Sequence, residues 1–314
     1  MYYVGIDLGG TNIAAGLVTE EGKILCDMSI PTRAERDWRE IVADMADLSK
    51  QLIEKAGVSV SEVGGVGIGC PGAIDNANGV CTYSNNINME NAGIAEEFKK
   101  HLDLPVNLEN DANAAALGEY EINGKGAECF VFVTLGTGVG GGIIINGKIF
   151  RGFNGAGAEI GHTVVVSGGE PCTCGRLGCW EAYASVTGLI RQTKAAMEKN
   201  PDSKMHELAE KEGKVSGRTA FDAAKAGDSA AQAVVDKYLE YVGEGITNMV
   251  NIFQPEKVVI GGSISKEGDY LLNPVKEYVK KNDYNRYMAK AQVEIATLFN
   301  DAGIIGAALS AKGK

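Results

Sequence analysis

Three cysteines and one histidine in the middle of the chain have the side chains of a structural metal site: His162, Cys172, Cys174 and Cys179. One imidazole and three thiolates form the Cys3His set that is typical of tetrahedral zinc. The alternative is a disulfide, but Cys172 and Cys174 are too close to pair without strain, and a reducing cytosol disfavours the bond. We therefore expect structural Zn²⁺ here. The spacing is not that of a nucleic-acid-binding zinc finger.

Two glutamates flank these ligands. Glu159 lies shortly before His162 in the sequence, and Glu181 follows Cys179 and Trp180. Folding around zinc would bring both carboxylates into one small area. Paired acids suggest the recognition of hydroxyl groups, and solvated surface charge is the alternative interpretation.

A carboxylate and two glycines end the first strand-like segment, in the run Asp7-Leu8-Gly9-Gly10-Thr11-Asn12. Residues without a Cβ let backbone N–H groups approach a phosphate closely, and the Thr11 hydroxyl adds a donor. A carboxylate repels phosphate, so the role that suits Asp7 is to hold Mg²⁺. The alternative is an ordinary hairpin turn, in which Asp and Gly are also favoured.

A second glycine run has similar surroundings, Leu135-Gly136-Thr137-Gly138-Val139-Gly140-Gly141. It fits the G-x-G-x-x-G pattern of dinucleotide-binding folds, but that fingerprint requires a helix next, whereas the Asn146-Gly147 turn predicts a hairpin. Both copies have Leu-Gly before the turn and Gly-Lys-Ile after the hairpin, which indicates a weak internal repeat. We interpret the second run as another phosphate-facing loop. The chain has no G-x-x-x-x-G-K-[ST] pattern, which argues against a P-loop enzyme.

An amide and a carboxylate, Asn110 and Asp111, stand where a short strand meets a helix. Such strand ends are where ligands bind in α/β folds. Asp111 could accept a proton from a substrate hydroxyl while Asn110 orients that hydroxyl. The alternative is a helix N-cap, for which both residue types are preferred.

A third glycine turn, Gly261-Gly262, follows the apolar segment Val258 to Ile260. Glycines cluster at the ends of β-like runs in this chain, which indicates tight turns around a ligand. The backbone of this turn could lie against the adenosine of a nucleotide. A plain strand-to-helix turn is the alternative.

Composition limits the classes of partner. The net charge is -11 and no dense run of Lys and Arg is present, so we expect no nucleic-acid partner. No stretch approaches the roughly 18 to 20 apolar residues needed to cross a bilayer. The chain runs from Met1 into a strand-like segment without the features of a signal peptide. We therefore expect a cytoplasmic protein with no membrane partner.

Strand-like and helical segments alternate, and each half contains a hairpin, which predicts an α/β fold with mixed sheets. The length of 314 residues favours two lobes. Apolar residues at helical spacing predict helices over 35–56, 111–120, 180–199, 217–226, 229–251 and 303–311. Strands are expected over 2–8, 13–18, 63–68, 106–108, 129–135 and 257–260.

Taken together, these runs resemble the bacterial ROK sugar kinases, and look most like the glucokinases of that family. The resemblance covers essentially the whole chain and is also carried by Cys70-Pro71-Gly72, Glu109-Asn110-Asp111-Ala112-Asn113 and Asn300-Asp301-Ala302-Gly303. The family implies an actin-like, ribonuclease-H-like two-lobed ATPase fold with ATP and sugar in the cleft. We expect a smaller lobe of residues 1–118 with 300–314, and a larger lobe of residues 119–299 that contains the zinc site.

The resemblance also implies roles for single residues. Asp111 would be the general base on the sugar 6-hydroxyl, and His162 would ligate zinc through one ring nitrogen and meet the sugar with the other. The implied substrate contacts are Asn86, Asn110, Asp111, Glu159, His162 and Glu181. The implied cofactor contacts are Asp7, Gly9, Gly10, Thr11, Asn12, Gly136, Thr137, Gly138, Gly261 and Gly262.

The expected reaction is phosphorylation of glucose at the 6-hydroxyl, with MgATP and a hexose as partners and a homodimer or homotetramer as the assembly that the family favours. One run departs from the family: Ile87-Asn88-Met89 replaces the Gly-Trp often found in glucokinases just after the asparagine that corresponds to Asn86. A kinase for fructose, mannose or an N-acetylhexosamine is therefore the first alternative. The second is a sugar-sensing repressor, although such regulators carry an N-terminal helix-turn-helix extension and this chain begins on its first strand.

Overall fold

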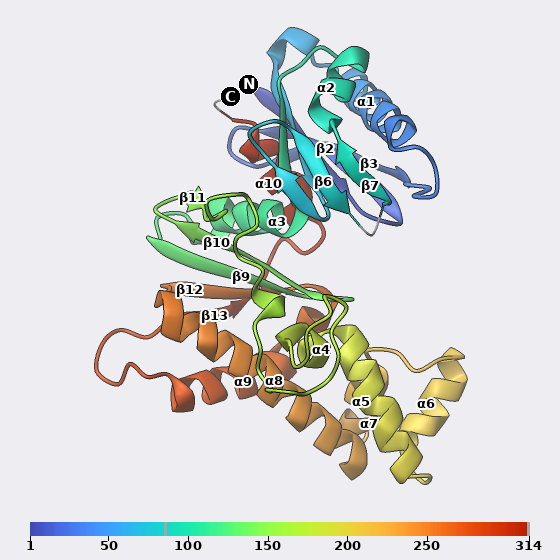
Figure 1. Cartoon of the computed structure of the whole chain (residues 1–314), viewed down its shortest axis with the longest axis vertical. Coiled ribbons are helices and arrows are strands. Elements are labelled where there is room, and N and C mark those ends of the chain that lie inside the picture. The colour runs from blue at the N-terminus through green and yellow to red at the C-terminus, as the bar shows by residue number, and fades with distance from the viewer. Residues whose placement is uncertain (85–86, 313–314) are drawn as a thin grey trace. The chain divides into compact units, whose positions relative to one another are not determined.

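A computed structural model describes residues 1–84 and 87–312 of the chain, which form two compact units (Figure 1). The first unit comprises Met1–Phe132, Gly142–Ala158 and Thr297–Lys314, and the second comprises Val133–Gly141 and Glu159–Ala296. Asn86, one of the expected sugar contacts, lies outside the described residues. The lobe boundaries expected from the sequence stay a prediction.

The first unit contains a five-stranded mixed sheet in the order β3-β2-β1-β4-β8. Two antiparallel hairpins join β1, β2 and β3, whereas β4 and β8 run parallel to β1. Because β1, β4 and β8 are parallel, their carboxyl ends meet at one edge, and they bring Asp7, Cys70 and Asn110 to it. The strands are β1 (Tyr2–Leu8), β2 (Asn12–Thr19), β3 (Ile24–Pro31), β4 (Val63–Cys70) and β8 (Val106–Asn110).

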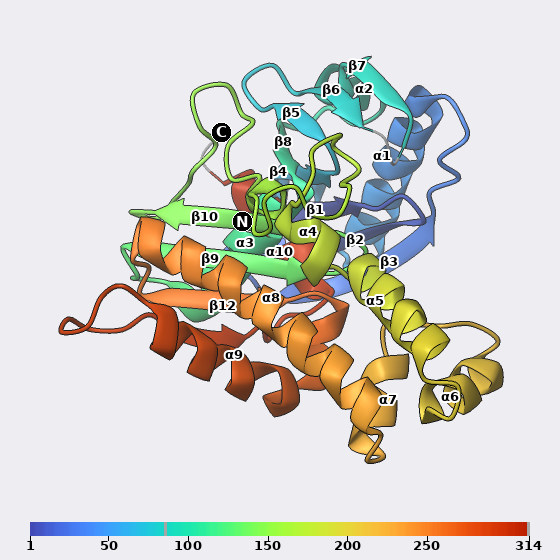
Figure 2. The same ribbon diagram turned by 60° about the horizontal axis from the view of Figure 1, so that its bottom comes forward.

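Helices cover both faces of this sheet (Figure 2). Successive side chains of a strand point to opposite faces. Val4 accordingly packs in the cluster with α1 (Trp38–Lys55) and α2 (Ile94–His101), while Tyr3 packs against α10 (Asp301–Ser310). A Cβ at Gly67 of β4 would overlap the Ala307 carbonyl, so α10 lies directly on the strand backbone.

The helix that begins with Asp111, α3 (Asp111–Glu119), is fixed along its length. It crosses α10 so closely that a Cβ at Gly306 would overlap the Ala114 carbonyl. At its other end the fully buried Glu119 carboxylate accepts a hydrogen bond from the Leu298 N–H at 2.8 Å, before a π-helical turn over Tyr120–Gly124. The position of Asp111 is therefore set by a helix that is held at both its middle and its end.

The described residues form two further sheets. A three-stranded sheet in the first unit, not anticipated from the sequence, contains β5 (Ala73–Asp75), β6 (Val80–Ser84) and β7 (Met89–Ala92). A second five-stranded sheet has the order β11-β10-β9-β12-β13, and the division between the units passes through β9 and β10. Its strands are β9 (Cys129–Leu135), β10 (Val139–Ile145), β11 (Lys148–Ile149), β12 (Lys257–Gly261) and β13 (Gln292–Ile295). The expectation of mixed sheets is confirmed.

The glycine run from Gly136 leads into a strand. β10 pairs with β11 across the Asn146-Gly147 turn, with Ile145 opposite Lys148. The predicted hairpin is confirmed, and the helix that a dinucleotide fingerprint requires is replaced by β10.

The second unit is mainly helical, and α8 (Ser229–Phe253) packs against several of the other helices (Figure 1). The side chain of Trp180 is fully buried against it: the indole N–H donates to the Tyr241 carbonyl at 2.8 Å, and a Cβ at Gly245 would overlap the ring. No helix in the described ranges is long and apolar enough to cross a membrane. The other helices are α4 (Trp180–Ala184), α5 (Val186–Lys199), α6 (Lys204–Glu212), α7 (Thr219–Lys225) and α9 (Asp269–Asn282).

The prediction of a single helix over 180–199 is wrong. Ser185 is extended, with a ψ of 164°, and separates α4 from α5. Its hydroxyl accepts a hydrogen bond from the Gly188 N–H at 3.0 Å, while the Val186 N–H donates to the Gly136 carbonyl at 2.8 Å. A local cap and a tertiary contact therefore outweigh the continuous helical pattern.

Candidate active site and metal centre

Two carboxylates stand at the carboxyl edge of the first unit's sheet. Asp7 is near the end of β1, and Asp111 begins α3; both are half-buried. Burial, and then the charge of Asp111, raise the pKa of Asp7 to about 6. Burial likewise raises the pKa of Asp111, although a hydrogen bond from the Ala112 N–H at 2.8 Å acts in the opposite direction. Neighbouring acids with raised pKa values fit a site that holds a cation or accepts a proton.

Asn110 is the N-cap of α3. Its Oδ1 accepts a hydrogen bond from the Asn113 N–H at 3.1 Å, and its Nδ2 donates to the Gly72 carbonyl at 3.2 Å. The cap anticipated as an alternative role is therefore present. The Asn110 side chain also bonds to the neighbouring Asp111 carboxylate and, like the Ala112 N–H, opposes the rise in its pKa.

A partly buried ion pair lies beside this cap. The Glu109 side chain accepts two hydrogen bonds from Arg151, one of them from Nε at 2.8 Å. Arg151 is not predicted from the sequence, because nothing in the spacing of two residues so far apart links it to Glu109. The only available signal was a lone arginine entering the glycine-rich segment 150–158.

The first glycine turn connects β1 with β2 and is closed by a hydrogen bond from the Gly9 N–H to the Asn12 carbonyl at 3.0 Å. Thr32 supports it from the end of β3: its N–H donates to the Thr11 carbonyl at 2.9 Å, and its hydroxyl to the Gly9 carbonyl at 2.6 Å. Thr32 is fully buried, while Gly10 and Thr11 are exposed. The turn is thus a hairpin with a fixed, outward-facing tip, and Thr32 is a support that sequence analysis missed.

The second glycine loop is held within the second unit. The Gly136 N–H donates to the Gly138 carbonyl at 3.0 Å, and the Thr187 hydroxyl donates to the Thr137 carbonyl at 2.8 Å. A Cβ at Gly138 would overlap the Glu181 carboxylate, whereas a Cβ at Gly136 would have no atom of the described residues within 4 Å. A side chain at Gly138 would therefore displace the Glu181 carboxylate, whereas one at Gly136 would point into open space.

The third glycine turn packs against the end of β9. Gly262 has a φ of 83°, and a Cβ there would overlap the backbone of Leu135. The turn leads into a short 3-10 helix, Ser263–Glu267, whose Ser265 N–H donates back to the Gly262 carbonyl at 3.2 Å. It is thus a strand-to-helix turn, as the simpler interpretation of the sequence anticipated.

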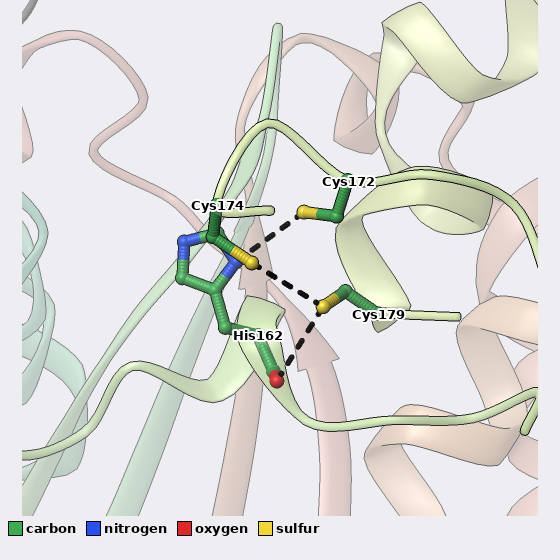
Figure 3. Close-up of side chains that lie close together, drawn as sticks. All are labelled: His162, Cys172, Cys174 and Cys179. Carbon is green, nitrogen blue, oxygen red and sulfur yellow. Dashed lines mark hydrogen bonds between the residues drawn. The ribbon is translucent and has the colours of Figure 1, made fainter. Parts of the chain in front are cut away.

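The Cys3His residues form one cluster (Figure 3). Their ligand atoms all lie within 4.8 Å of one another, with Cys172 Sγ 3.6 Å from His162 Nδ1 and Cys174 Sγ 3.6 Å from Cys179 Sγ. The last distance is far longer than a disulfide bond of about 2.05 Å. Ligand bonds of about 2.0 to 2.3 Å at tetrahedral angles place ligand atoms about 3.3 to 3.8 Å apart. The two separations of 3.6 Å match this range, the full spread of 4.8 Å is wider, and the donor set is one that suits zinc.

Local structure presents each ligand. His162 ends the short 3-10 helix Ile160–His162, and a tight turn closed by a Gly175 N–H to Cys172 carbonyl bond at 3.0 Å carries two of the cysteines. Cys179 precedes α4, which the buried Trp180 anchors to α8. The cluster therefore depends on the core of the second unit.

The flanking glutamates are placed differently. Glu181 is half-buried: its Oε2 accepts a hydrogen bond from the Val139 N–H at 3.0 Å, and its Oε1 accepts one from the Thr173 hydroxyl at 3.3 Å. Glu159 is exposed, and its carbonyl accepts a hydrogen bond from the His162 N–H at 3.1 Å. The second ring nitrogen of His162 points away from the three sulfur atoms (Figure 3).

Residues 3–314 match the ROK family, which is nearly the whole chain. The chain belongs to the ROK family. It is 40% identical over 307 residues to a glucokinase of Halalkalibacterium halodurans, with 97% of this chain and 93% of the relative covered. It is also 29% identical over 305 residues to a xylose repressor of Caldicellulosiruptor bescii, with 96% of this chain and 76% of the relative covered. The family therefore includes a kinase and a regulator among this protein's relatives.

The fold of this ROK protein is similar to a crystal structure of a ROK family glucokinase from Streptomyces griseus in complex with glucose and AMPPNP. The TM-score is 0.83 at 35% identity, and 98% of each chain is covered. ROK sugar kinases have the actin-like ATPase fold, so the predicted fold class is confirmed.

The predicted residues of this ROK protein fall into two groups, one in each unit. The first unit contains Asp7, Gly9, Gly10, Thr11, Asn12, Asn110 and Asp111. The second contains Gly136, Thr137, Gly138, Glu159, His162, Cys172, Cys174, Cys179, Glu181, Gly261 and Gly262. Within each unit, structure adds supports that the sequence did not reveal, Thr32 and Arg151 in the first and Thr187 in the second.

Proposed function

We propose that this ROK protein is an ATP-dependent hexose kinase that phosphorylates glucose at the 6-hydroxyl. The observation that carries the proposal is the Asp111 carboxylate, held at the start of α3 on the same sheet edge as Asp7, with its pKa raised by burial. Similarity to the glucokinases of H. halodurans and S. griseus supports both the reaction and the sugar.

Asp111 is the proposed general base. A carboxylate whose pKa is raised by burial is a stronger proton acceptor than an exposed one. It takes the proton of the sugar 6-hydroxyl as that oxygen bonds to the γ-phosphorus of ATP and ADP leaves. Positioning and electrostatic stabilisation supply most of the rate in such transfers. The proposed sugar contacts are Asn86, Asn110, Glu159, His162 and Glu181.

The glycine turns are the proposed phosphate and nucleotide contacts. The exposed tip at Gly10 and Thr11 and the open face at Gly136 leave room for a ligand next to the backbone. Asp7 would hold Mg²⁺, since a divalent cation offsets the repulsion that helps to raise its pKa, and the bound ion would offset phosphate charge. The Gly261-Gly262 turn is proposed to lie against the adenosine.

Structural zinc is proposed for His162, Cys172, Cys174 and Cys179, supported by the fit of their spacing to a tetrahedral site. When bound, zinc would tie the 3-10 helix at His162 to the start of α4. Glu181 lies in the first turn of α4, so zinc would fix its carboxylate for a sugar hydroxyl.

A sugar-sensing regulator is the second candidate, and the similarity to a xylose repressor is the observation that favours it. A regulator would bind a sugar and release no ADP. A cytoplasmic location and a homodimer or homotetramer are also proposed for this protein; light scattering would measure the assembly.

The deciding experiment is an ADP-release assay with glucose, mannose, fructose, N-acetylglucosamine and N-acetylmannosamine. We expect the highest kcat/KM with glucose, and a phosphate on its 6-hydroxyl by NMR. Preference for another hexose would keep the kinase and overturn the sugar. Sugar binding without ADP release from any member of the panel would overturn the kinase and favour the regulator.

A further inference from the structure

The most buried charge near Asp111 belongs to Glu109, whose side chain is 2% exposed near the end of β8. Its Oε2 accepts both hydrogen bonds from Arg151. A carboxylate so far from water is costly unless a cation and hydrogen bonds compensate its charge. Arg151, which belongs to the same unit as Glu109, supplies that cation, and its side chain is 34% exposed.

The other oxygen of Glu109 holds the beginning of α3. Oε1 accepts a hydrogen bond from the Asn110 N–H at 3.1 Å and one from the Asn113 side-chain amide at 3.3 Å. Asp111 lies between these two residues in the first turn of the helix. The Glu109 carboxylate therefore holds the helical turn that positions the Asp111 side chain. The position of the Glu109 carboxylate in turn depends on Arg151.

Arg151 is itself held by the backbone. The N–H of Phe150, the preceding residue, donates to the Ile143 carbonyl at 2.7 Å, and the Gly157 N–H donates to the Arg151 carbonyl at 2.9 Å. The guanidinium then delivers two N–H groups to a single oxygen of Glu109. A lysine would keep the charge but not this planar pair of donors.

We propose that Glu109 and Arg151 are positioning residues for Asp111 and act as one unit. The proposal rests on the proposed kinase function. It assigns neither residue a contact with substrate, so their loss is expected to lower kcat while leaving KM nearly unchanged. A small displacement of a catalytic group is sufficient to slow a reaction by about a hundredfold.

The test compares Arg151→Met, Arg151→Lys and Glu109→Gln in the full-length enzyme. We expect Arg151→Met to lower kcat by between about tenfold and a hundredfold, with KM for glucose and ATP within about twofold of wild type. Arg151→Lys should recover part of that loss, because it restores the charge. The double variant Glu109→Gln/Arg151→Met should be no slower than Arg151→Met alone, because residues that act as a unit are not additive.

A matched control is the exposed pair Arg218–Glu212, which has the same chemistry with a 2.9 Å separation. Arg218→Met should keep wild-type kcat. Wild-type kcat in both Arg151→Met and Glu109→Gln would overturn the positioning role, as would a raised KM at constant kcat or multiplying losses in the double variant. Wild-type enzyme that turns over no sugar would overturn the kinase and this role together, so the two failures are distinguishable. Glu109→Gln keeps an oxygen acceptor and serves as the test if Arg151→Met does not fold.

Discussion

The Glu181 carboxylate accepts a hydrogen bond from the Val139 N–H at 3.0 Å, and this bond joins two loops with different proposed chemistry. Glu181 belongs to the helix that follows the last cysteine of the metal cluster, whereas Val139 follows the second glycine loop. A change in either loop therefore reaches the other through one side chain.

Two glycine substitutions should separate packing from phosphate contact. Gly138→Ala places a Cβ on the Glu181 carboxylate, so we expect a raised KM for glucose and a lowered melting temperature. Gly136→Ala adds a methyl group in open space, so its melting temperature should match wild type while KM for ATP rises. Kinetics and thermal unfolding of both variants test this; equal effects of the two on glucose KM would contradict the assignment.

Loss of the metal should weaken sugar binding. We expect about one zinc per chain by elemental analysis in the wild type, and little in Cys179→Ser. Because zinc would fix the helix that carries Glu181, the variant and the chelated enzyme should bind glucose about tenfold to a hundredfold more weakly by calorimetry.

Cys26→Ser is the control for this experiment, since Cys26 lies on β3 in the other unit. It should retain zinc and glucose affinity. Unchanged glucose affinity after complete removal of the metal would contradict the structural link to Glu181.

Asp111→Asn should separate binding from chemistry. Asparagine keeps an oxygen for the Ala112 N–H, so the first turn of α3 is preserved. It does not accept a proton as the carboxylate does, and we expect kcat to fall by about 10²- to 10⁴-fold with glucose affinity within about threefold of wild type. ADP release and calorimetry measure the two quantities. Near-normal turnover would exclude Asp111 as the base.

Asp7 should make the metal-free enzyme less stable as pH rises. Its pKa is raised to about 6, so the folded state favours the protonated carboxyl, and that contribution is full below about pH 4 and lost as pH rises through about 6. The free energy of unfolding of Asp7→Asn should therefore exceed that of wild type by about 1 to 3 kcal/mol at about pH 7.5. At about pH 4 the two free energies should be equal. Urea unfolding in magnesium-free buffer measures this.

Asp75→Asn is the control of opposite sign. The Asp75 carboxylate accepts a hydrogen bond from the Asn78 side-chain amide at 2.7 Å and one from the Asn78 backbone N–H at 3.1 Å. These bonds lower the pKa of Asp75. That variant should lose stability relative to wild type above the ordinary pKa of an aspartate. If Asp7→Asn raises the free energy of unfolding by the same amount at every pH, the charge of Asp7 is not the cause.

The sequence by itself determined the chemistry that this chain can carry and the family to which it belongs. The Cys3His set, the glycine turns and the Asn110-Asp111 pair depend on residue type and short spacing, which are local properties. The strands that the sequence predicts and the hairpin at Asn146-Gly147 follow from short apolar runs and turn preference, and are found where they were expected.

Only the tertiary structure decided how those residues are held. Arg151 meets Glu109 across a long stretch of chain, Thr32 supports the Gly9 turn, and Ser185 divides a helix whose apolar pattern is continuous. None of these contacts leaves a periodic signal, because each depends on where distant segments pack. The difference between Gly136 and Gly138 has the same origin. A Cβ at Gly138 would meet the Glu181 carboxylate, whereas a Cβ at Gly136 would meet no atom of the described residues within 4 Å.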